Sequence, residues 1–157
     1  MTKRILKGKW KVVLLILILI LLLVFGCVIG SAFILNRETS PVNQTLTRFL
    51  QDLSTDNLDH AYSLFSTQTK AAKSKMDLQQ MIVSGKAQFS DFKSVENTYF
   101  YVDVAPWHTM TCNYSGIVTY NNGDKGTLTA SLIKENGEWK IILVTIVVDV
   151  NRMNEFK

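Results

Sequence analysis

The most constraining feature of the sequence is an uncharged run of 24 residues, 12–35, close to the N-terminus. As an α-helix rising ~1.5 Å per residue, it would be about 36 Å long, slightly more than the ~30 Å hydrocarbon core of a bilayer. A charge-free segment of this length is typical of a membrane-spanning helix. We therefore expect residues 12–35 to cross a membrane once.

The charges that flank this run predict its orientation. Five cationic residues precede it, namely Lys3, Arg4, Lys7, Lys9 and Lys11. Because positive flanks are retained in the cytoplasm, residues 1–11 are expected to form a cytoplasmic tail of a plasma (inner) membrane protein. The C-terminal part is then extracytoplasmic, with residues 36–40 as a linker and residues 41–157 as one domain.

The net charge of +4 arises from this tail. Without its five cations, 12 basic residues remain against 13 acidic ones. A near-neutral domain lacks the basic footprint that nucleic-acid binding requires, so we expect no nucleic-acid partner.

A cleaved signal is the alternative interpretation of the apolar run. The apolar core of a secretory signal is usually ~7–15 residues long. The residues Val24-Phe25-Gly26-Cys27 faintly resemble a lipoprotein cleavage box, but the run continues past Cys27 to Leu35. We favour an uncleaved signal anchor. Cys112 then has no partner for a disulfide, and the domain depends on its apolar core.

Gly26 and Gly30 form a Gly-x-x-x-Gly pattern within the expected span. Small residues four apart let two membrane helices approach closely. They are candidate contacts for a homo-oligomer, although glycine is also common in such helices.

The domain changes from a helical to a strand pattern near residue 93. Ser40-Pro41 predicts a helix start, and an apolar stripe follows at Val42, Leu46, Phe49, Leu50 and Leu53. Further helices are predicted over 58–65 and from a Ser74 cap to Gly85. Alternating residues then predict about four strands, with a hairpin turn at Asn136-Gly137 and a last strand, 139–150, that runs centrally. The fold class is α+β, with about three helices packed on a curved antiparallel sheet.

The same segments resemble a known family. The helical part Asp59-His60-Ala61-Tyr62-Ser63-Leu64-Phe65 and the hairpin Glu135-Asn136-Gly137-Glu138-Trp139-Lys140-Ile141 are similar to the opening and ending of nuclear transport factor 2-like (cystatin-like, ketosteroid-isomerase-like) domains. The resemblance covers roughly residues 41–150. It implies a cone between sheet and helices, in a fold that hosts enzymes, ligand binders and scaffolds.

In the enzymes of this superfamily the cone holds an acid or base with Tyr or His partners. The pocket candidates by that resemblance are Tyr99, Tyr101, Asp103, Tyr114 and Trp139. An Asp shielded from water could take a proton, whereas one at a strand end is ordinarily solvated. We assign no catalytic residue. The cysteine and histidine spacing matches no metal site, so no metal or cofactor is expected.

The function expected from the sequence is a single-pass membrane protein whose extracytoplasmic domain binds or organises other membrane or envelope proteins. The alternatives are a small apolar ligand binder and, third, an isomerase- or hydrolase-type enzyme. A scaffold predicts a filled cone and exposed aromatic side chains. A binder or an enzyme predicts an open pocket with a few convergent polar groups.

Overall fold

The computed structural model describes residues 14, 16–21, 38–104 and 109–156, and the chain divides into two compact units, Met1–Glu38 and Thr39–Lys157. In the first unit, residues 16–21 are helical. No helix among the described residues is both long enough and apolar enough to span a membrane. Most of the expected span, with Gly26 and Gly30, lies outside the described residues, as do the cytoplasmic tail and linker residues 36 and 37.

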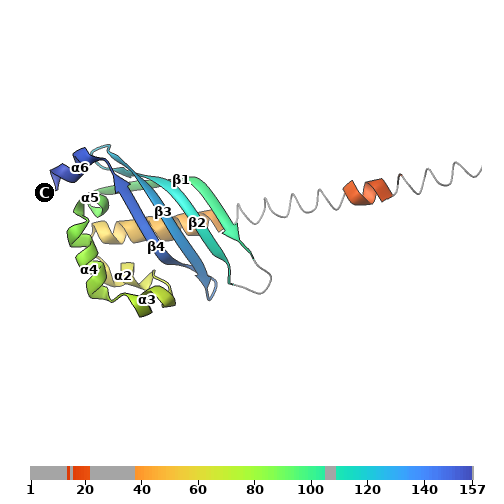
Figure 1. Ribbon diagram of the computed structural model, residues 1–157, viewed down its shortest axis with the longest axis horizontal. Coiled ribbons are helices and arrows are strands. Elements are labelled where there is room, and N and C mark those ends of the chain that lie inside the picture. The colour runs from red at the N-terminus through yellow and green to blue at the C-terminus, as the bar shows by residue number, and fades with distance from the viewer. Residues whose placement is uncertain (1–13, 15, 22–37, 105–108, 157) are drawn as a thin grey trace, which may run out of the picture. The chain divides into compact units, whose positions relative to one another are not determined.

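The second unit is an α+β domain, which confirms the expected fold class. A long helix covers residues 38–54. The other elements, in chain order, are α2 (Leu58–Ser63), α3 (Thr67–Ala72), α4 (Lys75–Ser84), α5 (Lys86–Phe89), β1 (Phe92–Asp103), β2 (Thr111–Tyr120), β3 (Lys125–Glu135), β4 (Glu138–Val148) and α6 (Val150–Glu155). The long helix lies behind the sheet in Figure 1, with α2 and α3 below it and α6 above its left end.

The long helix is held by the apolar stripe that the sequence predicts. Its side chains Val42, Leu46, Phe49, Leu50 and Leu53 are all buried in the core. Burying side chains of this size is the main stabilising contribution, at ~25 cal/mol per Å² of apolar surface.

The predicted start of this helix is wrong, because residues 38–40 are already helical. Ser40 therefore does not cap it, and these residues are not linker. A two-residue cap signal is a weak local preference, which tertiary packing often overrides.

The cap predicted at Ser74 is confirmed. Its hydroxyl accepts a hydrogen bond from the Asp77 N–H at 3.2 Å, and the Asp77 carboxylate accepts one from the Ser74 N–H at 2.7 Å. This reciprocal pair satisfies two backbone donors at the start of α4. The short helices α3, α5 and α6 were not predicted from the sequence.

The sheet is an antiparallel meander in the order β1-β2-β3-β4. Asn136 and Gly137 form its last turn, with φ of 52° and 87°, and confirm the predicted hairpin. The prediction that the last strand runs centrally is wrong, because β4 lies at an edge. Its apolar outward residues Leu143 and Val147 are exposed rather than covered by a further layer. Apolar residues on both faces of β4 therefore did not indicate a central position in the sheet.

Candidate functional site: a filled cone and an exposed sheet face

The strand register divides the five pocket candidates between two faces of the sheet. Tyr114 and Trp139 are buried on the inner face, against the helices. Tyr99 pairs with Ser115 and Tyr101 pairs with Asn113. Successive side chains of a strand alternate between faces, so Asn113 and Ser115, on either side of the buried Tyr114, lie on the outer face. Their partners Tyr101 and Tyr99 lie on the same outer face, and so does Asp103.

The structure thus corrects the expectation of one shared pocket. Alternation places Tyr99, Tyr101 and Asp103 on one strand face, as the sequence predicts. Only the register with β2 decides that this face points away from the helices.

The inner face is filled by its own side chains. The Tyr114 hydroxyl donates to Asn43 Oδ1 at 2.7 Å, and the Tyr120 hydroxyl donates to the Gln88 carbonyl at 2.8 Å. Gly116 admits the Tyr114 ring, since a Cβ at this glycine would come within 2.9 Å of that ring and 2.6 Å of a β1 carbonyl. The described residues therefore close the cone with tyrosines that are already hydrogen-bonded.

Burial makes the titratable groups of the inner face chemically inert near neutral pH. Desolvation raises the pKa of the Cys112 thiol to about 12. Desolvation also raises the pKa of Tyr114 to about 12, with a smaller contribution from nearby Cys112. Both groups remain neutral, so neither is a thiolate nucleophile nor a phenolate base.

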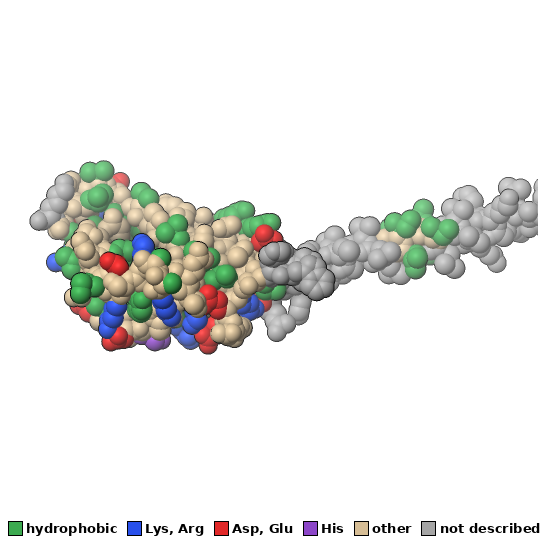
Figure 2. All heavy atoms as spheres, turned by 60° about the horizontal axis from the view of Figure 1, so that its bottom comes forward, with side chains coloured by type: hydrophobic (Ala, Val, Ile, Leu, Met, Phe, Trp, Pro, Cys, Tyr) green, Lys and Arg blue, Asp and Glu red, His purple; other side chains and the backbone are tan. Residues whose placement is uncertain are grey.

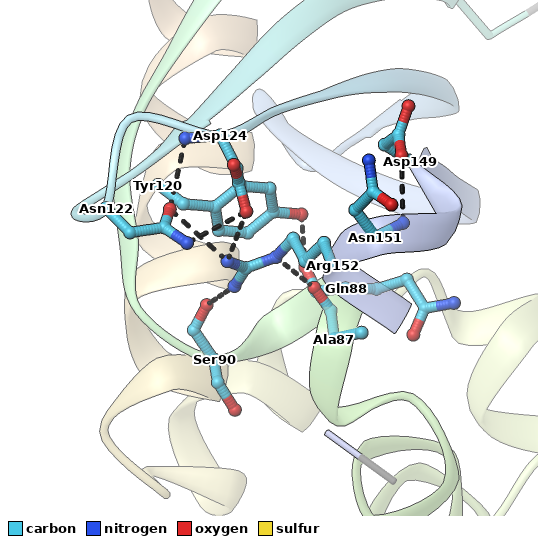
Figure 3. Close-up of polar contacts among 9 residues, drawn as sticks. All are labelled: Ala87, Gln88, Ser90, Tyr120, Asn122, Asp124, Asp149, Asn151 and Arg152. Atoms are coloured by element: carbon cyan, nitrogen blue, oxygen red, sulfur yellow. Dashed lines mark hydrogen bonds and ion pairs between the residues drawn. The ribbon is translucent and has the colours of Figure 1, made fainter. Parts of the chain in front are cut away.

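A buried arginine, which no sequence pattern indicates, joins α6 to the sheet (Figure 3). Arg152 is 1% exposed, and its guanidinium lies 3.5 Å from the centre of the Tyr120 ring. Its Nε donates to the Ala87 carbonyl at 2.6 Å, and Nη2 donates to the Ser90 carbonyl at 2.8 Å. Asp124 lies 3.6 Å from Nη1. These internal contacts leave no room for an anionic ligand, so the role of Arg152 is structural.

The outer face presents exposed apolar and aromatic side chains around an uncharged centre. Tyr99 and Tyr101 on β1 are 57% and 50% exposed, and Leu143 and Val147 on β4 are 57% and 66% exposed. Between them, β2 and β3 carry mainly hydroxyl and amide side chains, with Ile117 and Ile133 as apolar exceptions; the polar residues are Thr111, Asn113, Ser115, Thr119, Thr127, Thr129 and Ser131. A shallow depression of about 170 Å³ lies between Tyr99 and Leu143.

The helical side of the domain differs in chemistry from the outer face. Acidic and basic side chains gather there over α2, α3 and α4 (Figure 2), and His60 lies on α2. The His60 Nδ1 atom lies 2.5 Å from an Asp52 carboxylate oxygen, and the His60 side chain is half exposed. Within residues 38–104 and 109–156, no group of three His, Cys, Asp or Glu side chains could hold a metal ion.

Comparison with known proteins gives matches to solved structures only. No protein-family model matches the chain, and no curated protein matches its sequence. A Nostoc punctiforme protein, described as of unknown function with a cystatin-like fold, aligns with 16% identity and a TM-score of 0.48, covering 70% of this chain and 90% of that one. Aln2 from a Streptomyces species aligns with 13% identity and a TM-score of 0.46, covering 76% and 96%. The likeness is one of fold.

Proposed function

We propose that this chain is a single-pass membrane-anchored protein whose extracytoplasmic domain is a protein-interaction or scaffolding module of a cell-envelope complex. The observation that carries the proposal is the contrast between the two faces of the sheet. The inner face is filled and hydrogen-bonded, whereas the outer face exposes Tyr99, Tyr101, Leu143 and Val147 around an uncharged centre. Exposed aromatic residues without central charges are the composition of protein interfaces.

The apolar run supports the membrane anchor in this proposal. Leu14 and residues 16–21 are helical, and their side chains are between 50% and 61% exposed. No side of this helical segment is buried, although every side chain in it is apolar. A helix that is apolar all round is suited to lipid.

The alternatives of a small-ligand binder and an enzyme have less support. Pockets for small ligands usually enclose roughly 300–1,000 Å³. The described inner side of the sheet and its adjoining helices leave a cavity of about 120 Å³, at the β4 edge. Asp103, the acidic pocket candidate, is exposed on the opposite face.

The test is site-specific photo-crosslinking in cells that produce the full-length protein. A benzoylphenylalanine at Tyr101 samples the outer face, and one at Gln79, exposed on α4, is the matched control. The proposal predicts a discrete crosslinked protein from Tyr101, either a partner or a second copy of this chain, and none from Gln79. No crosslink from Tyr101, or equal crosslinking from both positions, would overturn it.

Self-association through the membrane is a separate part of the proposal. Replacing Gly26 and Gly30 by Leu should weaken association of the full-length protein, because bulky side chains keep partner helices apart. A membrane-helix association reporter measures this. An equal signal from the double-Leu form would show that the glycines are not a contact face.

A further inference from the structure

The free side of edge strand β4 is covered along only part of its length. Near its start, the Ile141 N–H donates to the Leu64 carbonyl, and the Ile141 carbonyl accepts from the Ser66 N–H, each at 2.9 Å. The Thr69 hydroxyl also donates to the Ile142 carbonyl at 3.0 Å. A short segment before α3 therefore already pairs with β4 here, in the parallel direction.

A bulge then changes which backbone groups point outward. In an antiparallel pair, alternate residues direct their N–H and C=O groups to opposite sides. Ile141 directs its groups outward, and the register shift between Ser131 and Leu132 inserts Ile142 as an extra residue. Beyond it, the residues paired with β3 through hydrogen bonds are Leu143, Thr145 and Val147, so Val144 and Ile146 direct their backbone groups outward.

The outward groups of Val144 and Ile146 form no hydrogen bond with any described residue. An exposed row of such groups is a template for another extended chain. Val144 is half-buried and Ile146 is 7% exposed, so β4 offers unpaired donors and acceptors in ladder spacing at a partly covered edge, directly after the segment where the chain itself already pairs.

A groove runs beside this part of β4. Its cavity of about 120 Å³ is lined mainly by apolar side chains, including Phe65, Leu78, Met81 and Val144. Lys73 also contributes to the lining. This volume is well below the roughly 300 Å³ of the smallest usual ligand pockets, so the groove suits a single apolar side chain.

We propose that β4 binds an extended peptide segment of a partner protein by strand addition. The segment pairs its backbone with Val144 and Ile146 and inserts one aliphatic side chain between Met81 and Leu78. The unpaired backbone groups select this occupant, because only an extended backbone repeats donors and acceptors at that spacing, while the groove supplies side-chain preference. The site is separate from the outer sheet face, so it stands or falls independently of the proposed function.

The first test measures amide hydrogen exchange by NMR on the full-length chain in detergent micelles. The Val144 and Ile146 amides should exchange at least about tenfold faster than the Thr145 amide, which pairs with β3. Equally slow exchange at all three amides would show that the edge is already covered and would overturn the proposal.

The second test selects a phage-displayed random heptapeptide library on the full-length chain in the same micelles. Enriched peptides should share one aliphatic residue at a fixed position, and synthetic copies methylated on their central amide nitrogens should not bind. Val144→Pro removes an N–H that points away from β3 and forms no hydrogen bond with it. An edge strand tolerates proline at such a position. It should weaken peptide binding at least about tenfold.

Met81→Glu, on the partly exposed side of α4, tests the groove without altering the strand and should weaken binding similarly. Val147→Ser, on the outer face, is the matched control and should leave peptide affinity unchanged. The proposal fails if no peptide is enriched, or if enriched peptides bind the Met81→Glu form as tightly as the unchanged protein.

Discussion

Replacing Arg152 by Met should detach α6 and destabilise the domain substantially. Methionine keeps much of the apolar stem but removes every donor of the guanidinium. The buried carbonyl of Ala87 and the part-buried carbonyl of Ser90 then lose their partners, at about 1–3 kcal/mol each. The stacking on Tyr120, 3.5 Å away, contributes about 1–2 kcal/mol more.

The half-exposed Asp124 contributes little to this sum, because solvent screens its ion pair. Relief of the buried charge offsets part of the loss. We expect a net decrease of about 3–5 kcal/mol in the free energy of unfolding, a large share of the ~5–15 kcal/mol of a typical domain.

The assay is urea unfolding of residues 39–157, followed by circular dichroism. We expect this part to fold without the anchor, since it has its own core. Arg152→Lys keeps the charge but cannot reach both carbonyls in a fork, so it should cost about 1–3 kcal/mol. Asp124→Asn is the control and should cost less than about 1 kcal/mol. If Arg152→Met also falls below about 1 kcal/mol, Arg152 does not hold α6 to the sheet.

Three further predictions concern orientation, the core and pH. A cysteine added after Lys157 should react with an impermeant thiol reagent in intact cells, and labelling only after lysis would reverse the proposed topology. Cys112 is buried, so it should give little background labelling. Trp139→Ala should lower the free energy of unfolding by about 3–5 kcal/mol in urea, because the side chain is buried, and a loss below about 1 kcal/mol would contradict this. Burial raises the pKa of Cys112 and Tyr114 to about 12, above their ordinary values of 9.0 and 10.0. The unfolded state releases these protons first, so the contribution of these two groups to stability should be constant below about pH 9 and fall between about pH 9 and pH 12, and Cys112→Ala should reduce that slope.

Local patterns predicted the elements because each depends on neighbouring residues. The stripe from Val42 to Leu53 repeats at helical spacing, so one face of the helix could be recognised as buried without knowing what covers it. The Ser74 cap and the Asn136-Gly137 turn depend on side chains and backbone angles within four residues. The uncharged run 12–35 predicts an anchor for the same reason: length and charge are local properties.

The candidate site could not be predicted in this way, because it depends on pairing between distant segments. Alternation grouped Tyr99 with Tyr101, but only the pairing with Ser115 and Asn113 places them on the outer face. Arg152 reads as a surface cation in a short polar segment, and its burial depends on Ala87 and Ser90, more than 60 residues away.

The edge position of β4 illustrates the same limit. Its composition, apolar on both faces, predicted a central strand. Among the described residues, however, no strand pairs with the outward backbone groups of Val144 and Ile146. The sequence by itself determined which segments carry the apolar side chains whose burial stabilises a fold, through the hydrophobic effect on each side chain. Strand order, register and the bulge at Ile142 emerged only when the whole chain packed, because hydrogen-bond partners on neighbouring strands are chosen by geometry across the sheet.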